Sequence, residues 1–287
     1  MTLPDAIKQP ILRSFHIHTV TPGWKFNGSG PNEKHRQLLV EYDNVVEELN
    51  LLSPKYVFVI LVTSIQIYLI INFRYRNIII TTVSKMGNGM ADYTHKAATT
   101  GSIQVETLAE YNQYCHYAGG IVAQALSQIF SASGIESPSI GTQLELSNMM
   151  GLFIQKSDII GDYREDVDQQ QYFWPREIWG REEYGFKAMT EMYKTDPDTV
   201  HRATYVQSAM ILDALQHATD VLDYLRLVRN QSNFHATAIV IVKAFADLEH
   251  SFMNKEIFQR KIEIRKAEVA KVCEYPFFFF FLVHLRG

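Results

Sequence analysis

The feature that most constrains the fold is a helical spacing of apolar residues along most of the chain. In six long stretches, apolar residues recur every three or four positions, with few glycines or prolines between them. Turn-forming sequences fall between the stretches, at residues 21–32, 133–141 and 194–198. Alternating strand patterns are not evident, and no internal repeat is seen. The sequence therefore predicts an all-α, single-domain fold with helices over residues 33–50, 86–98, 105–130, 142–168, 199–229 and 231–272.

Residues 57–84 depart from this pattern. Eight of these 28 residues are Ile, none is Asp, Glu, Gly, Ala or Pro, and the only charges are Arg74 and Arg76. Three interpretations are open: a borderline membrane span, near the lower limit of about 17 residues; a buried strand or helix; and translated non-coding sequence. The C-terminal residues 273–287 contain five consecutive Phe and have the same character. We expect 57–84 to be a low-complexity apolar insertion outside the bundle, and 273–287 to be an atypical tail.

Charge and cysteine content narrow the class of protein. Lys and Arg total 27 against 31 Asp and Glu, a formal net charge of -4. That balance argues against nucleic acid as a partner, because phosphate binding needs a basic surface. The two cysteines, Cys115 and Cys273, cannot build a disulfide framework, which favours a reducing compartment. The first 15 residues lack the apolar core of a signal peptide.

The stretch IIGDYREDVDQQQYFWPREIW contains a cluster of acids at helical spacing. At 100° per residue, Asp158, Asp162, Glu165 and Asp166 share one face of a helix, and apolar residues lie opposite. Carboxylate oxygens are the ligands that Mg²⁺ prefers, often together with substrate phosphates. Such a face can hold Mg²⁺ against a diphosphate, but a solvated acidic face is the commoner explanation of the same pattern.

A second informative stretch is residues 105–134. Tyr114 and Tyr117 share a face of the expected helix, and the pair Gly119 and Gly120 thins its middle. Glycine within a helix costs about 1 kcal/mol relative to alanine, so the pair needs a reason. Close helix packing and space for a bulky apolar ligand are the two candidates. A tyrosine beside such a space could stabilise a carbocation with its ring face. His116 by itself is best explained as a buried, hydrogen-bonded histidine, and zinc is not indicated.

Taken together, these stretches resemble the squalene synthase family, the farnesyl-diphosphate farnesyltransferases of sterol biosynthesis, and above all its fungal members. The resemblance covers most of the chain outside 57–84 and the last 15 residues. It is carried by PGWKFNGSGPNEKHRQLLVEYDNVVEE, KMGNGMADYTHKA, ETLAEYNQYCHYAGGIV, LSNMMGLFIQKSDIIGDYREDVDQQQYFWPREIWGR, TYVQSAMILDALQHATDVLDYLRLVRNQS and FQRKIEIRKAE.

The resemblance implies an isoprenoid synthase helical bundle over residues 1–272, interrupted by 57–84. It implies a reaction in which two farnesyl diphosphates condense head to head to presqualene diphosphate, which NADPH then reduces to squalene. Carried over by position, Asp162, Glu165 and Asp166 match a Mg²⁺-binding motif. Tyr114 matches the catalytic tyrosine of the first step, and Arg265 matches a residue used for NADPH. The family also implies the cytosolic face of the endoplasmic reticulum membrane.

Several departures from the family pattern qualify these expectations. The first Asp-rich motif of the family would precede Met1, and the usual C-terminal membrane anchor is missing. Gly161 replaces an arginine of the family's NIIRDY pattern, and Glu263 replaces a lysine. We therefore keep two alternatives: a catalytically impaired remnant that only binds isoprenoid diphosphate, and a phytoene synthase-type prenyltransferase.

Overall fold

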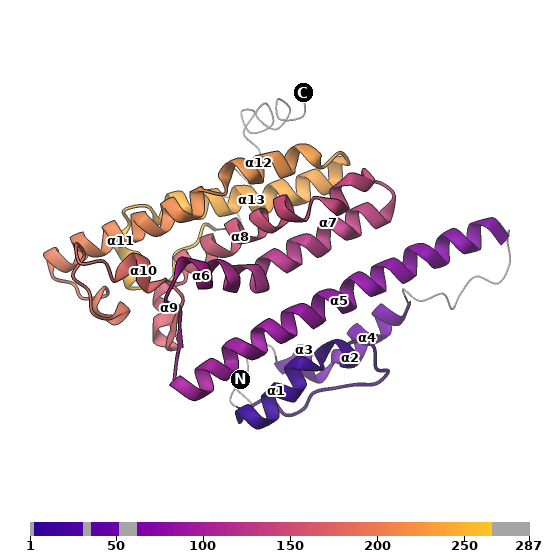
Figure 1. Ribbon diagram of the computed structural model, residues 1–287, viewed down its shortest axis with the longest axis horizontal. Helices are drawn as coiled ribbons and strands as arrows, with labels where there is room; N and C mark the ends of the chain where they lie inside the picture. Colours follow the sequence, from indigo (N-terminus) through magenta and orange to yellow (C-terminus); the bar gives the residue numbers. More distant parts are fainter. Residues whose placement is uncertain (1–2, 31–35, 52–61, 266–287) are drawn as a thin grey trace.

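The computed structural model describes residues 3–30, 36–51 and 62–265. Within these ranges the ordered structure is almost entirely helical, which confirms the predicted all-α fold (Figure 1). The α-helices are α1 (Asp5–Arg13), α2 (Phe15–His18), α3 (Arg36–Val40), α4 (Tyr42–Leu51), α5 (Val62–Thr100), α6 (Leu108–Cys115), α7 (Ile121–Ser133), α8 (Leu144–Gly161), α9 (Tyr163–Asp168), α10 (Arg176–Trp179), α11 (Pro197–Leu215), α12 (Ala218–Leu227) and α13 (Gln231–Ser251).

Shorter elements join these helices. A π-helical turn, η1 (His116–Gly120), lies between α6 and α7, and 3₁₀ turns form η2 (Pro138–Thr142), η3 (Met189–Glu191) and η4 (Lys255–Phe258). Two strands that the sequence did not predict, β1 (Ile103–Gln104) and β2 (Gln171–Tyr172), pair in parallel. This short ladder brings the chain before α6 beside the chain that follows α9.

Helix α8 is the centre of the bundle. It packs against α6, α7, α11, α12 and α13. Its sequence explains this position, because buried side chains cover several of its faces, from Met150 and Phe153 to Ile159 and Ile160. A helix that is apolar nearly all round is typical of a protein core. Helix α9, which follows the C-terminal end of α8, is therefore attached to a helix that is buried in the core.

Helix α5 runs along α7 on one side and is covered by α1 and α2 on the other (Figure 1). It is a single helix of 39 residues, which includes the described part of the segment 57–84 and continues into the stretch 85–97. Residues 57–61 lie outside the described ranges, as do 273–287. The expected separation of 57–84 from the bundle stays a prediction. Among the described residues, no helix has the length and apolar character needed to span a membrane.

The helix expected over 231–272 is wrong for residues 252–265, and its last part, 266–272, lies outside the described residues. Helix α13 ends at Ser251, and Met253 adopts a left-handed conformation with φ of 54°. The side chain of Gln207 donates to the carbonyl oxygen of Ser251, which fixes this end. Further on, the amide of Ile262 donates to the carbonyl oxygen of Gly161 at 3.0 Å. These tertiary hydrogen bonds replace the helical ones that the apolar spacing suggested.

Other expected helices are interrupted. The helix expected over 142–168 is divided at Asp162, whose φ and ψ are -90° and 5°. The helix over 199–229 is divided between α11 and α12, near His217. The helix over 105–130 begins only at Leu108, where Thr107 accepts a hydrogen bond from the amide of Glu110 as an N-cap. At the second of these interruptions, both α11 and α12 pack against α8.

A buried charged cluster joins α8 to α11. The Lys156 ammonium donates to the Asp213 carboxylate at 2.7 Å and lies 3.0 Å from Nε2 of His217. Only 1% of the Lys156 side chain is exposed. The ammonium also lies 5.3 Å from the centre of the Tyr111 ring, within the range of a cation–π contact. Burial, followed by the neighbouring Lys156, lowers the pKa of His217 below its usual 6.5.

We expect His217 to make the protein less stable in mild acid. Because its pKa is lower in the folded state, the unfolded chain takes up the proton more readily below pH 6.5, and stability falls as the pH decreases. Chemical denaturation at pH 7 and pH 5 measures this loss. His217→Gln should reduce it, whereas His250→Gln, at an exposed position, should leave it unchanged. An equal loss in all three proteins would contradict the assignment.

Candidate active site

The four acids predicted to share a face lie where α8 ends and α9 begins. Although the helix is divided at Asp162, the amide of Asp162 donates to the carbonyl oxygen of Asp158, and the amide of Asp166 donates to that of Asp162, each at 2.9 Å. The helical register is thus preserved across the division. Asp162, Glu165 and Asp166 lie close enough to interact electrostatically, because the charges of Asp162 and Glu165 both raise the pKa of Asp166.

Asp166 is the most perturbed of these acids. Burial, followed by the charges of Asp162 and Glu165, raises its pKa to about 8, while Lys261 opposes the shift. Within the described part of the chain, its carboxylate has neither a hydrogen bond nor an ion pair. A carboxylate that is partly buried beside two others and lacks a cation is a strong candidate for a metal ligand.

Lys261 is a member of this site that the sequence analysis did not identify. Its ammonium lies 2.9 Å and 3.2 Å from the two carboxylate oxygens of Asp162. It also lies 4.0 Å from Glu165 and 3.8 Å from Glu263. Lys261 belongs to the stretch FQRKIEIRKAE, but nothing in the local sequence indicates a contact with Asp162, which is 99 residues away.

Tyr114 lies close to the acids on an aromatic platform. Its ring stacks on that of Phe173 at 4.4 Å and meets the ring of Tyr93 edge-on at 5.0 Å. Burial, followed by the charge of Asp166, raises the pKa of Tyr114. The neighbouring Trp174 donates its indole N–H to the carbonyl oxygen of Ile159 at 3.3 Å, which anchors the platform to the last turns of α8.

The glycine pair serves close helix packing. A Cβ placed on Gly119 would lie 2.6 Å from the carbonyl oxygen of Gly151 in α8, and one on Gly151 would lie 2.6 Å from that of Gly119. The two backbones therefore touch, which favours packing over space for a ligand at this point. His116 is hydrogen-bonded as expected, with Nδ1 2.6 Å from the side-chain oxygen of Asn148, but it is only partly buried. A π-helical turn at such a contact is common near functional sites.

Arg265 is the last described residue and is exposed. It follows Ile264, whose amide donates to the Asp247 carboxylate at 2.6 Å. Glu263, two residues earlier, is also acidic and is 58% exposed. Glu263 stands where the family pattern has a lysine, and its carboxylate would repel the phosphates of NADPH. An acidic residue at position 263 does not fit a site for the NADPH phosphates.

The oxygen donors at the α8–α9 junction fit Mg²⁺ in kind. Hard divalent cations prefer carboxylates, usually one or two of them with waters and substrate phosphates. In the part of the chain that the structure describes, no three His, Cys, Asp or Glu side chains already converge as a metal site. Lys261 instead makes the cationic contact to Asp162. The Mg²⁺ assignment to Asp162, Glu165 and Asp166 therefore stays a prediction.

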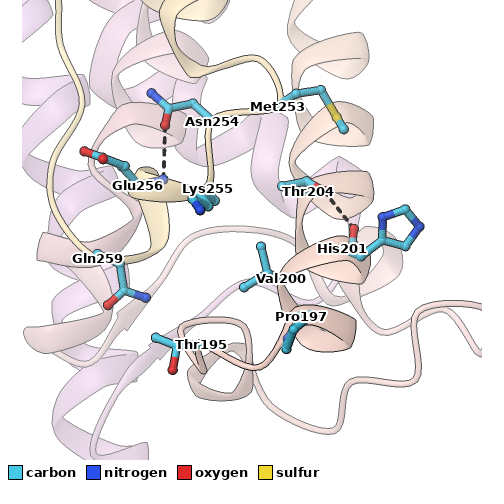
Figure 2. Close-up of a pocket in the computed structure, with 10 residues that line it drawn as sticks. All are labelled: Thr195, Pro197, Val200, His201, Thr204, Met253, Asn254, Lys255, Glu256 and Gln259. Carbon is cyan, nitrogen blue, oxygen red and sulfur yellow. Dashed lines mark hydrogen bonds between the residues drawn. The ribbon is translucent and has the colours of Figure 1, made fainter.

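Two cavities can be compared as reaction sites. One of about 370 Å³ adjoins the acids and is lined by Gln155, Ser157, Asp158, Gly161, Asp162, Asp247, Lys261, Ile262 and Glu263. A larger one, of about 1020 Å³, lies between the start of α11 and the turn after α13 (Figure 2). Its only carboxylate, that of Glu256, is bound by Arg260 at 2.7 Å. The larger cavity therefore lacks paired acids, whereas Asp158 and Asp162 both line the smaller one, which is the better candidate for the metal-binding side of the site.

Comparisons with known proteins identify the family. The sequence model of the squalene/phytoene synthase family matches residues 70–267, a range that begins within the segment 57–84. A squalene synthase from Ganoderma lucidum is 49% identical over 280 residues, covering 95% of this chain and 56% of that protein. One from Mycosarcoma maydis is 40% identical over 278 residues, covering 93% and 45%. The chain thus spans about half the length of these curated relatives.

A solved structure supports the same relationship at the level of the fold. It is described as the complex structure of TcSQS with the ligand E5700, and its TM-score to this chain is 0.79 at 31% identity. The superposition covers 96% of this chain and 72% of that one. The family match, the identity to the fungal proteins and the shared helical architecture lead to one conclusion. The chain belongs to the squalene/phytoene synthase family and is similar to squalene synthases over nearly its whole length.

Proposed function

We propose that this chain carries a prenyl-diphosphate condensing site of the squalene synthase type, acting on farnesyl diphosphate to give presqualene diphosphate. The observation that supports this most is the position of Asp162, Glu165 and Asp166 beside the Tyr114–Phe173 stack. The acids would hold Mg²⁺, which when bound stabilises the charge of a departing diphosphate. The aromatic platform would face the apolar tail and the carbocation left behind.

Each residue has a distinct part in this proposal. Asp162 and Asp166 lie one helical turn apart, and their carboxylates would hold the metal that binds the diphosphate. The ring faces of Tyr114 and Phe173 supply the quadrupole that attracts a cation without donating electrons to it as a base would. The Tyr114 hydroxyl, which has no hydrogen bond to the described residues, is free to act on a proton of the substrate.

The second half of the family reaction, reduction to squalene by NADPH, belongs to the proposal only through family membership. Because Glu263 does not fit the cofactor phosphates, we derive no reduction step from these residues. The endoplasmic reticulum membrane is likewise proposed from the family alone. A chain that binds isoprenoid diphosphate without turning it over is the second candidate, and the Lys261–Asp162 ion pair is the observation that favours it.

Replacing Tyr114 by phenylalanine tests the assigned role of its hydroxyl. The ring contacts with Phe173 and Tyr93 remain, so thermal stability should be unchanged. Formation of presqualene diphosphate from farnesyl diphosphate and Mg²⁺ should fall roughly 100-fold or more, the usual contribution of a positioned proton-transfer group. Tyr205→Phe, on the exposed face of α11, is the matched control. Equal rates in Tyr114→Phe and wild type would remove the tyrosine from the mechanism.

The same assay separates the two candidate functions. A wild-type chain that binds a farnesyl diphosphate analogue in calorimetry but yields no presqualene diphosphate supports the binding-only candidate. Product formation that depends on Mg²⁺ supports the condensing enzyme. Equal product formation in excess chelator would show that the reaction needs no metal, and would contradict the assignment of the acids as metal ligands.

A further inference from the structure

The contact between Lys261 and the acids depends on how the chain segment that carries it is held. Residues 261–265 run along the end of α8 with alternating exposure: Ile262 and Ile264 are buried at 4% and 7%, while their neighbours point outward. The Ile262 amide donates to the carbonyl oxygen of Gly161 at 3.0 Å, and the Ile264 amide donates to Asp247 at 2.6 Å. Two apolar anchors and two backbone hydrogen bonds thus fix the position of Lys261.

Gly161 makes this approach possible. A Cβ at position 161 would lie 2.4 Å from the carbonyl oxygen of Ile262, closer than real Cβ contacts allow. A larger residue would therefore push the segment away from α8 and take Lys261 with it. Because Gly161 has no side chain, the segment can pack against α8. Lys261 then places its positive charge beside Asp162 at this end of the helix.

We propose that Lys261 is an internal counter-ion that competes with a divalent cation for the acids at the α8–α9 junction. Its ammonium engages both oxygens of Asp162 and lies 4.0 Å from Glu165, so a metal on these residues has to displace it. Asp166 is not in contact with Lys261 and stays available for the metal. Glu263, already 3.8 Å from the ammonium, provides the partner to which Lys261 turns when it leaves Asp162.

This inference rests on the proposed metal-binding function of the acids and adds a residue that tunes it. Removing the ammonium leaves the carboxylates in place and takes away their competitor. Lys261→Met should therefore bind a divalent cation more tightly than the wild-type chain, roughly tenfold, which corresponds to about 1.4 kcal/mol. The methylene part of the side chain is retained, and 39% of the side chain is exposed, so the fold should tolerate the change.

The test uses Mn²⁺ as a probe for Mg²⁺ and needs no turnover. The electron paramagnetic resonance signal of free Mn²⁺ is followed as each protein is added, and melting temperatures are recorded with and without the metal. Arg260→Met is the matched control, because it removes one positive charge at the adjacent position, where the guanidinium binds Glu256 at 2.7 Å instead of the acids. We expect tighter binding, and a larger metal-dependent rise in melting temperature, in Lys261→Met only.

Several outcomes overturn the inference. Equal affinity in Lys261→Met and wild type would show that the lysine does not compete, and weaker affinity would show that it supports the metal. Equal gains in Lys261→Met and Arg260→Met would reduce the effect to net charge. If wild type binds Mn²⁺ measurably and Lys261→Met binds it no better, only the role of Lys261 fails. If neither binds Mn²⁺, even with farnesyl diphosphate added, the proposed function of the acids fails as well.

Discussion

Replacing Asp162 and Asp166 together by asparagine is expected to abolish the uptake of Mg²⁺ by this chain in the presence of a farnesyl diphosphate analogue. Only Glu165 would remain of the three carboxylates, and one carboxylate without a second beside it is a poor ligand set for a hard dication. Asparagine keeps the size of each side chain and removes its charge. Isothermal titration calorimetry with and without the analogue measures the metal uptake directly.

The same variant should lose presqualene diphosphate formation by several orders of magnitude. Departure of a diphosphate requires neutralising a large negative charge, and a bound metal supplies several kcal/mol of that stabilisation. Each 1.36 kcal/mol of lost transition-state stabilisation corresponds to about a tenfold decrease in rate, so losing several kcal/mol decreases the rate by several orders of magnitude. Asp220→Asn together with Asp223→Asn is the matched control: the charge change is the same, but the positions lie on α12, where Asp223 binds Arg226 at 2.6 Å.

The melting temperature of the double variant distinguishes a loss of metal binding and activity from unfolding. The pKa of Asp166 is raised to about 8 in the folded protein, so its carboxyl disfavours the folded state once the pH exceeds the unfolded value of about 4. Asparagine removes that unfavourable ionisation, and the double variant should melt at the wild-type temperature or above it at pH 8. Full metal uptake by the double variant, with its melting temperature unchanged, would contradict the assignment of the acids.

The sequence predicted the elements that depend on local pattern. Helical apolar spacing is sufficient to identify α8 and α11, because their buried residues recur with the helical period. The acids were placed together correctly because Asp162, Glu165 and Asp166 lie within about one turn of each other, so no distant contact is needed to bring them close. The packing role of the glycine pair, in contrast, became clear only when Gly151 was found against it.

What the sequence could not show depends on contacts between distant segments. The apolar spacing continues beyond Ser251, yet Gly161 and Asp247 bind the amides of Ile262 and Ile264 and hold that stretch extended. Lys261 reaches the acids for the same reason. Helical periodicity indicates which side chains are buried. It does not indicate which backbone groups form hydrogen bonds with distant residues, and at this end of the bundle such hydrogen bonds determine the backbone conformation.

The second large effect is expected at the core of the bundle, where Lys156→Met should destabilise the protein by about 3–5 kcal/mol. Lys156 is almost fully buried, and its ammonium neutralises Asp213, whose side chain is only 10% exposed. Methionine fills a similar volume but leaves that carboxylate in the interior without its cation. Because small domains are stable by only about 5–15 kcal/mol, this is a substantial fraction of the total. Urea denaturation of the variant and the wild type gives the difference.

The partners of Lys156 make the prediction sharper. His217 lies 3.0 Å from the ammonium, and once Lys156 is gone a protonated His217 can supply the missing positive charge to Asp213. The destabilisation by Lys156→Met should therefore be smaller at pH 5 than at pH 8. Adding Asp213→Leu should recover most of the loss, since replacing a whole buried ion pair by apolar residues is often neutral or stabilising.

A surface pair provides the comparison. Arg226→Met breaks the exposed ion pair with Asp223 and should cost less than about 1 kcal/mol, because solvent screens both charges. A loss of similar size in Lys156→Met would mean that water or a rearranged side chain compensates Asp213. A double variant no more stable than Lys156→Met alone would mean that the lysine acts through its packing against Tyr111, and not through its charge. The expected order of stability is thus wild type and the double variant first, Lys156→Met last, with the gap between them closing as His217 becomes protonated.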